Sequence, residues 1–409
     1  MAEKGFTTQI LHSDRLAGVT HGSVHKPVHN SVAYGYSNVE ELAAVFQNKV
    51  KGYSYGRQNN PTTTALEEKI TAMEQGLATA CFSTGMAAIT ASLLTLLKAG
   101  DHLISSQFLF GNTNSLFNTL TNFGIELSFV DATDVEQVAA AKQNNTRAVF
   151  VETIANPCTQ VSDLAAIGDF CADNNLLYIV DNTMTSPVLF VPKHVKAGLV
   201  INSLTKAIAG HANVLGGAVT DTGLFDWSSY DNILDTYKKG EAKNWGLMQI
   251  RKKGLRDMGA TLSPHSASAI ALGAETIALR VPRACENAGA LAALFAQHPA
   301  VAKVHYPGRS EHPQHQRAAD WFAGFGMLLS IDLKDEHQCF PFLNKLCCAI
   351  LSSHLGDNRT LVIPVAQTIF YEMGPERRAS MGISEGTVRI SVGIEDQQDL
   401  LDDFSQALG

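Results

Sequence analysis

The sequence predicts an α/β protein with a mostly parallel central sheet and a smaller α+β domain at its C-terminal end. Short apolar runs alternate with helical stretches from about Thr62 onward, which is typical of parallel strands that helices cover on both faces. After Leu255 this alternation gives way to longer helical spacing and a separate Gly-rich strand. The length of 409 residues agrees with about two or three domains.

Residues 1–60 differ from the rest of the chain. They are rich in histidine and tyrosine, and only Val39–Gln47 has the spacing of a helix. A long segment that is too polar to form its own domain often reaches across to another subunit, so we expect an arm of this kind. The predicted parts are therefore an arm at 1–60, an α/β domain at 61–257 and an α+β domain at 258–409.

Hydrophobic spacing assigns the elements in order. The helices expected in the α/β domain are Thr62–Glu74, Gly85–Leu97, Asn114–Asn122, Val135–Gln143 and Leu164–Asn174. The strands expected there are Ala78–Phe82, His102–Ser105, Glu126–Val130, Ala148–Glu152, Leu177–Asp181, Val200–Ser203 and Gly217–Thr220. The elements expected in the C-terminal domain are Ser266–Gln297, Ala302–Tyr306, Gly324–Asp332 and Gln397–Leu408. The long helical stretch should be kinked or broken at Pro282, because proline lacks a backbone N–H.

Composition excludes several classes of protein. The net charge of −8 and the lack of a polybasic run argue against nucleic-acid binding. The longest apolar stretches, such as Ala87–Leu97, fall short of the roughly 20 residues that cross a bilayer, so we expect no membrane span. The seven cysteines include no CxxC pair, and the N-terminus carries no apolar signal segment. We therefore expect a cytoplasmic protein with free thiols.

Other motifs have simple structural explanations. His21, His25 and His29 recur every four residues, but Pro27 interrupts the helix that would align them, so no metal site is predicted. Three further pairs are expected in ordinary structural positions: Cys347–Cys348 in the core, His312 and His315 at the surface, and Gly216–Gly217 at a close strand contact.

Polar residues follow several of the predicted strands at the point where each strand ends. These segments are Ser83–Met86, Glu152–Pro157, Asp181–Thr183 and Ser203–Lys206. The carboxyl ends of parallel strands meet at one edge of a sheet, where ligands gather. We therefore expect a lysine, an aspartate, small hydroxyls and a helix-starting glycine to converge there.

This combination fits pyridoxal phosphate (PLP). PLP needs a lysine for its Schiff base and a carboxylate for its pyridinium nitrogen, which Lys206 and Asp181 can supply. Its phosphate needs an anion site, which the free N–H groups of a helix beginning at Gly85 provide, together with the hydroxyls of Ser203 and Thr205. Taken alone, the aspartate could be an N-cap and the lysine a surface residue. The ordered set points to the cofactor.

Longer motifs resemble the Cys/Met-metabolism family of PLP enzymes over nearly the whole chain. This family includes the cystathionine γ-synthases and γ-lyases, the methionine γ-lyases and the O-acylhomoserine sulfhydrylases. The matching segments are Tyr53–Thr62 (YSYGRQNNPT), Ser83–Ala88 (STGMAA), Glu152–Pro157 (ETIANP), Asp181–Thr183 (DNT), Ser203–Lys206 (SLTK), Gly259–His265 (GATLSPH) and Gly386–Asp396 (GTVRISVGIED). The resemblance implies PLP as cofactor and the aspartate-aminotransferase-like fold, fold type I.

The resemblance also implies roles for the matching positions. The residues that would hold the cofactor are Tyr55, Arg57, Gly85, Met86, Phe110, Asn156, Asp181, Ser203, Thr205 and Lys206. Of these, Tyr55 and Arg57 would reach the cofactor of the neighbouring subunit, so a homo-oligomer is implied and a dimer of dimers is expected. Arg389 would bind the substrate α-carboxylate as a planar fork.

The pocket departs from the family pattern at three places. Phe110 stands where the family usually has a tyrosine that stacks on the cofactor and assists the leaving group, and phenylalanine cannot transfer a proton. His354 stands where a small polar residue is usual, which makes it a candidate proton donor or substrate contact. The turn Ile363–Thr368 replaces the usual HPAS-type sequence. The predicted catalytic residues are thus Lys206, Phe110 and His354.

The predicted activity is PLP-dependent γ-elimination from an amino acid with a leaving group on Cγ, as in methionine γ-lyase and trans-sulfuration enzymes. Methionine, cystathionine and homoserine derivatives are candidate substrates, and so is canavanine, whose oxygen-linked leaving group needs little protonation. The alternative is γ-replacement on O-acetyl- or O-succinylhomoserine. A catalytically silent binder with this fold is a remote alternative, because fold does not determine function.

Overall fold

The large domain is organised around one sheet. The computed structural model describes residues 4–15 and 18–409, and in this part of the chain seven strands form a sheet in the order β1-β7-β6-β5-β4-β2-β3. Its strands are β1 (Ala78–Phe82), β2 (His102–Ser106), β3 (Glu126–Val130), β4 (Thr146–Glu152), β5 (Leu177–Asp181), β6 (Leu199–Asn202) and β7 (Gly217–Asp221). Only β7 runs antiparallel to its neighbours among these described strands, which confirms the mostly parallel sheet.

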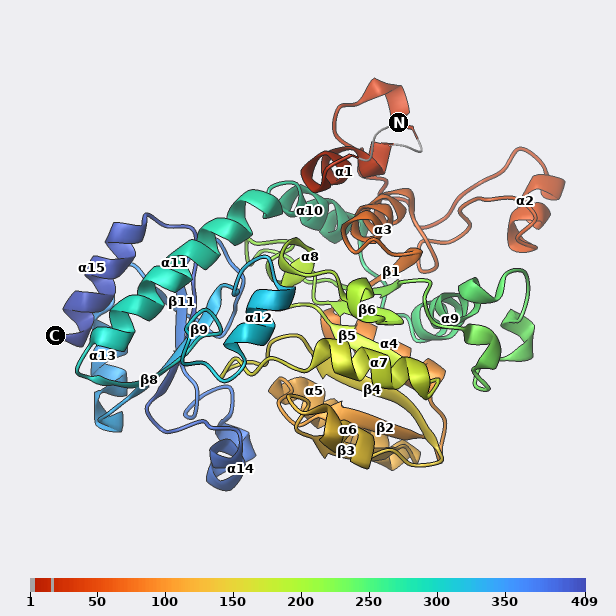
Figure 1. Ribbon diagram of the computed structural model, residues 1–409. Coiled ribbons are helices and arrows are strands. Elements are labelled where there is room, and N and C mark those ends of the chain that lie inside the picture. Colours follow the sequence, from red (N-terminus) through yellow and green to blue (C-terminus); the bar gives the residue numbers. More distant parts are fainter. Residues whose placement is uncertain (1–3, 16–17) are drawn as a thin grey trace.

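Helices cover both faces of this sheet (Figure 1). They are α3 (Pro61–Met73), α4 (Gly85–Leu96), α5 (Gly111–Leu120), α6 (Val135–Ala140), α7 (Leu164–Asp173), α8 (Ser186–Leu189), α9 (Trp245–Gln249) and a π-helical stretch at Ile250–Asp257. Strand residues alternate between the two cores. Phe150 packs in the cluster that includes α4 and α5, whereas Val149 and Val151 pack in the cluster that includes α7, as the two-residue period of a strand requires.

The C-terminal domain has its own sheet. Five described strands lie in the order β10-β11-β12-β9-β8. They are β8 (Val301–His305), β9 (Leu328–Leu333), β10 (Ile350–Leu351), β11 (Leu361–Pro364) and β12 (Thr387–Ser391). The helices are α10 (Pro264–Ala274), α11 (Ile277–Gln297), α12 (His315–Trp321), α13 (Cys339–Lys345), α14 (Pro375–Ser380) and α15 (Gln397–Leu408). Helices α11 and α15 pack together through an edge-on contact of Phe295 and Phe404, whose ring centroids are 5.4 Å apart.

The prediction of a break at Pro282 is wrong. Helix α11 continues through Pro282, and the interruption lies earlier, at Glu275–Thr276. The Arg280 side chain explains its position, because its guanidinium donates to the carbonyls of Gly273 (2.6 Å) and Ala207 (2.9 Å). The Gly273 carbonyl belongs to the last turn of α10, where helix carbonyls lack intrahelical partners.

The prediction that Cys347 and Cys348 lie in a core strand is also wrong. Cys347 is exposed and Cys348 half-buried, and both precede the short strand β10. The Asp403 carboxylate accepts hydrogen bonds from the backbone N–H groups of Cys347 (2.8 Å) and Cys348 (2.9 Å). These bonds hold the two residues in a loop after α13.

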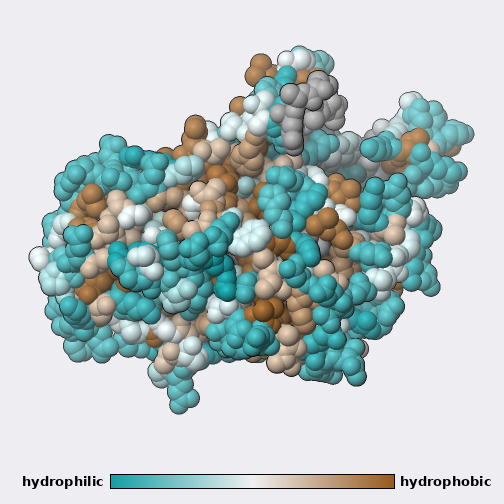
Figure 2. Space-filling model, viewed as in Figure 1, coloured by the Kyte–Doolittle hydropathy of each residue, from teal (hydrophilic) through white to brown (hydrophobic). Residues whose placement is uncertain are grey.

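The N-terminal arm contains two α-helices in its described residues, α1 (Phe6–His12) and α2 (Val39–Phe46). Helix α2 was predicted and stands away from the body of the protein (Figures 1 and 2), with Phe46 65% exposed. Helix α1 was not predicted. Fully buried Lys69 anchors it by donating to the Ile10 carbonyl (2.8 Å) and pairing with Asp14 (3.5 Å). Within residues 4–15 and 18–409, no group of side chains could hold a metal ion, and no helix is long and apolar enough to span a membrane.

Candidate active site

A cavity of about 510 Å³ opens at the carboxyl ends of the central strands, beside the C-terminal domain. It brings together nearly all the predicted site residues, although they are far apart in the sequence. Those that line it are Gly85, Met86, Phe110, Asn156, Asp181, Ser203, Thr205, Lys206, His354 and Arg389. Tyr55 and Arg57 do not line it.

One end of the cavity suits an anion. The Thr84 side chain caps α4 by accepting from the N–H of Ala87 (3.0 Å), and the other N–H groups of this first turn, which begins at Gly85, have no intrahelical partner. A Cβ at Gly85 would lie 2.9 Å from the Ser203 Cβ, and one at Gly217 would lie 2.1 Å from the Thr84 carbonyl oxygen. Only glycines therefore allow β7 and the Ser203 loop to close around this helix end, which confirms the close contact expected at Gly217.

Two carboxylates lie side by side on neighbouring strands. Asp181 and Glu152 are in register on β5 and β4. Burial raises the pKa of Asp181 to about 6, although the Thr183 side chain and N–H lower it. Burial and the charge of Asp181 raise the pKa of Glu152 to about 8, and Glu152 also accepts from the N–H of Phe110 (2.9 Å). Burial therefore disfavours ionisation of both carboxyls, and the charge of Asp181 disfavours it further at Glu152. A buried carboxylate at Asp181 suits a pyridinium nitrogen.

Glu152 was missed as a site residue by sequence reasoning. The available signal was its position at the end of β4, in the same segment as Asn156. Other residues of the cavity were also missed: Asn112 and Thr113 at the start of α5, Thr183 and Met184 after β5, and Leu215, Ser353, Leu355 and Ile369 from loops. Met184, Leu215, Leu355 and Ile369 give the cavity an apolar part.

Lys206 and His354 are in direct contact, with the lysine Nζ 3.3 Å from the imidazole Nδ1. Burial, and next the positive charge of Arg389, lower the pKa of Lys206 to about 8. Burial, and next the charge of Lys206, lower the pKa of His354 to about 4. The imidazole is therefore neutral near pH 7. Its predicted role as a proton donor or substrate contact stays a prediction.

Arg389 lies on β12 and is 1% exposed. Its guanidinium donates to the carbonyl oxygens of Ser353 (2.8 Å) and His354 (2.9 Å), and contacts the Asn156 Oδ1 at 3.4 Å. In the described residues, its buried Nε has no hydrogen-bond partner. Unpaired buried donors are costly, so these groups fit a site that is completed by an anionic ligand such as a carboxylate.

Tyr55 and Arg57 lie outside this cavity on the arm. Tyr55 is 43% exposed, and the Arg57 guanidinium lies 5.3 Å from the centroid of the Tyr55 ring. Arg57 also donates to the carbonyl of Arg256. The chain does not bring these two residues to its own site, so their predicted role toward a neighbouring subunit stays a prediction.

Glu74 is a fully buried carboxylate at the end of α3 that links two segments of the site. It accepts from the side-chain amides of Asn182 (3.0 Å) and Asn202 (2.6 Å). Asn182 follows Asp181 and Asn202 precedes Ser203, so Glu74 fixes the loops that present both predicted cofactor ligands. Burial raises the pKa of Glu74 to about 7, although both amides lower it.

We predict that Glu74→Leu weakens cofactor binding and destabilises the fold, whereas Glu74→Gln largely preserves both. Leucine leaves two buried amide donors unpaired, at about 1–3 kcal/mol each, whereas glutamine keeps a carbonyl acceptor. Cofactor affinity from absorbance titration and the free energy of unfolding from urea titration measure the two effects. Equal cofactor affinity in both variants would contradict this role.

Comparison of wild type with Glu74→Gln should also show that the stability contribution of Glu74 depends on pH. The raised pKa of Glu74 favours its protonated form in the folded state, so its contribution to stability falls as pH rises from 4.5 to about 7. The free energy of unfolding of wild type should therefore fall relative to Glu74→Gln by about 3 kcal/mol across this range. A constant difference between the two proteins would show that Glu74 does not titrate there.

Comparisons with known proteins agree with this site. A model of the family described as Cys/Met metabolism PLP-dependent enzymes matches residues 7–409. An L-methionine γ-lyase of Fusobacterium nucleatum subsp. polymorphum is 36% identical over 99% of this chain and 98% of its own. A homocysteine synthase of Schizosaccharomyces pombe is 33% identical over 98% of each chain.

A solved structure from Campylobacter jejuni subsp. jejuni carries N′-pyridoxyl-lysine-5′-monophosphate. It superimposes with a TM-score of 0.94 at 28% identity, covering 99% of this chain and all of its own. The two-domain fold, the charged cavity and the family match, which spans almost the entire sequence, lead to the same conclusion: the chain belongs to the Cys/Met metabolism family of PLP-dependent enzymes.

Proposed function

We propose that this enzyme catalyses γ-elimination from an amino acid that carries a leaving group on Cγ, releasing a 2-oxo acid, ammonia and the leaving group. The observation that carries the proposal is the convergence of Lys206, Arg389 and Asp181 on one cavity. When bound, PLP withdraws electrons from the α-carbon of the attached amino acid. The family match and the relatives named as lyases support this activity.

The residues of the cavity have distinct tasks in this proposal. The Arg389 guanidinium binds the substrate α-carboxylate and so orients the α-carbon. Lys206 Nζ removes the proton from that carbon. With its pKa lowered to about 8, a useful fraction of the amine is unprotonated near neutral pH, as a general base requires. The neutral His354 Nδ1 accepts a hydrogen bond from the amine and keeps it in place.

Phe110 favours leaving groups that need little protonation. It lines the cavity but has no hydroxyl, and the neutral His354 is a weak acid. O-acylated homoserines and the guanidinooxy group of canavanine meet this requirement better than thioethers do. The same observation favours the second candidate function, γ-replacement on O-acetyl- or O-succinylhomoserine, which the 33% identical homocysteine synthase also supports.

A substrate panel tests the proposal. The PLP-loaded protein should release 2-oxobutanoate from L-methionine, canavanine or O-acetylhomoserine without any added thiol. If a thiol suppresses 2-oxobutanoate and yields a thioether amino acid instead, γ-replacement is the better description. Release from none of these substrates, with or without thiol, would contradict both candidates.

We predict that Phe110→Tyr raises kcat/KM for methionine more than for O-acetylhomoserine. A positioned proton donor contributes about 10²–10⁴-fold, and a thiolate benefits from it more than acetate does. Steady-state kinetics on both substrates measure the ratio. The matched control is Phe110→Leu, which changes the ring but adds no hydroxyl. An equal gain on both substrates would contradict the proposal that the missing hydroxyl at Phe110 determines the preferred leaving group.

We also propose that the active enzyme is a homo-oligomer, a dimer of dimers, in which Tyr55 and Arg57 complete the site of a neighbouring subunit. Their exposure on the arm supports this arrangement. A cytoplasmic location is proposed as well, supported by seven cysteines that are all free and all within the described residues.

Mixed dimers of Arg57→Ala and Lys206→Ala chains should regain activity. Each hybrid dimer would contain one site with both defects and one site with neither, so random mixing leaves about one site in four intact. Turnover after refolding differently tagged chains together measures the recovery. Hybrids that have demonstrably formed but remain inactive would show that each chain builds its own site.

A further inference from the structure

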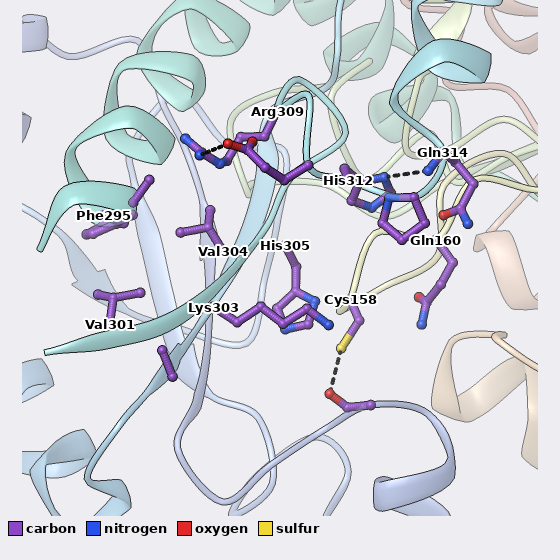
Figure 3. Close-up of a pocket in the computed structure, with 15 residues that line it drawn as sticks. Cys158, Gln160, Phe295, Val301, Lys303, Val304, His305, Arg309, His312 and Gln314 are labelled. Carbon is purple, nitrogen blue, oxygen red and sulfur yellow. Dashed lines mark hydrogen bonds and ion pairs between the residues drawn. The ribbon is translucent and has the colours of Figure 1, made fainter. Parts of the chain in front are cut away.

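A second cavity, of about 380 Å³, shares a loop with the active site. Cys158 and Gln160 of this loop line the second cavity, while Asn156, two residues before Cys158, lines the first. The remaining walls are β8, the turn 309–314, the end of α11 at Phe295 and Ala296, and Gly382 (Figure 3). The cavity is of a size that accommodates a small molecule.

Lys303 brings a positively charged side chain to this cavity. In the described residues, 4–15 and 18–409, no carboxylate lies within ion-pair distance of Lys303, which runs alongside His305 in Figure 3. The nearby acids already have partners. Glu311 pairs with Arg309 at 3.0 Å, and Asp332 accepts from the His305 Nε2 at 2.7 Å. Asp332 is the cross-strand partner of Lys303, but its carboxylate is hydrogen-bonded to His305, so the Lys303 ammonium forms no ion pair and can take up an anionic ligand.

His312 provides a neutral donor beside this charge. The backbone N–H of Gln314 donates to its Nδ1 (3.2 Å), which leaves the ring hydrogen on Nε2. This Nε2 lies 3.4 Å from the Thr159 hydroxyl, a weak contact that an anion can replace. Burial, and then the nearby His305 and Lys303, lower the pKa of His312 to about 4. His312 is half-buried, not at the open surface as expected.

The other end of the cavity is apolar. Phe295 and Val301 lie together in Figure 3, away from the cluster formed by His305, His312 and Lys303. Phe295 is fully buried and Val301 is 8% exposed. A ligand that fits both ends has an anionic head and a short apolar body.

We propose that this cavity is a second binding site for a small carboxylate. Its head group is held by the Lys303 ammonium and the His312 Nε2–H, and its apolar body lies against Phe295 and Val301. Hydrogen bonds to a charged partner are about twice as strong as neutral ones, so Lys303 supplies most of the recognition.

The occupant acts on the active site through the shared loop. The loop is tight, because the N–H of Ala155 donates to the Gln160 carbonyl (2.8 Å) and the N–H of Thr159 to the Ala155 carbonyl (3.0 Å). A ligand that displaces Thr159 therefore displaces Asn156, which contacts Arg389 at 3.4 Å. This coupling rests on the proposed function of Arg389 and Asn156, whereas the binding site does not.

Calorimetric titration of the holoenzyme with butanoate tests the site. Butanoate can also reach Arg389, so wild type should bind it at two places and Lys303→Glu at one, with affinity at the second cavity reduced at least about tenfold. His312→Asn, which keeps the charge of the cavity, should weaken the same event. Lys334→Glu is the matched control, because Lys334 is an exposed lysine of the same domain outside the cavity. Identical titrations of wild type, Lys303→Glu and Lys334→Glu would overturn the site.

The visible absorption of bound PLP tests the coupling. In wild type and in Lys334→Glu, titration with butanoate should change this absorption in two steps with different affinities. In Lys303→Glu it should change the absorption in one step. If Lys303→Glu loses one butanoate-binding event in calorimetry but shows the same change in PLP absorption as wild type, the second cavity is not coupled to the active site. Because calorimetry detects binding in an inactive enzyme as well, failure of the site and failure of the proposed function give different results.

Discussion

Lys206→Ala protein should lose essentially all turnover, together with the visible absorption of lysine-bound PLP. The lysine is the predicted attachment point of the cofactor and the base for the α-carbon proton, and its amine lies in the cavity with a lowered pKa. Loss of a general base alone costs about 10²–10⁴-fold in rate, so a fall of at least about 10³-fold in kcat is expected.

Spectra and rates of the purified variant measure this effect. The control is Lys98→Ala, since Lys98 is an exposed lysine of the same domain, and it should match wild type in both. Near-normal turnover in Lys206→Ala would refute the assignment of the active-site lysine.

Substitution of Arg389 should raise KM for the amino acid far more than it weakens PLP binding. A buried guanidinium that binds a carboxylate through two charge-assisted hydrogen bonds contributes about 1.5–3 kcal/mol per bond. Their loss in Arg389→Met corresponds to an increase in KM of about 10²–10⁴-fold. Arg389→Lys keeps the charge without the planar fork and should fall between wild type and Arg389→Met.

The visible spectrum separates this effect from misfolding. Arg389 also donates to the carbonyls of Ser353 and His354, so its substitution removes two contacts that hold this loop in place. Retained PLP absorption with a raised KM supports the proposed role. An unchanged KM in a variant that retains PLP would contradict it.

The sequence predicted those elements whose hydrophobic pattern matches their burial in the folded protein. Strand β1 was predicted with its exact bounds, because an apolar run between two helices can only be a buried strand here. The continuity of α11 could not be predicted. Proline usually interrupts a helix, but the actual interruption depends on Arg280, whose contacts with Gly273 and Ala207 form only in the folded protein.

The same distinction applies to the site. Lys206 and Asp181 were found because they end strands in recognisable motifs. The protonation of Glu152 and His354 could not be read from the sequence, since it depends on burial and on the charges of Asp181 and Lys206. The apolar wall at Leu215 was missed for a similar reason, because it comes from a loop with no motif.

The central claim, chemistry at Cγ, is tested most directly by isotope incorporation. L-Methionine is incubated with the holoenzyme in D₂O, and the 2-oxobutanoate is examined by proton NMR. γ-Elimination removes protons from Cα and Cβ and adds solvent hydrogen at the carbon that loses the thiolate. The account therefore predicts deuterium in both the methylene and the methyl group of the product. Product without deuterium in its methyl group would show that the bond to Cγ is broken by another route and would contradict the account.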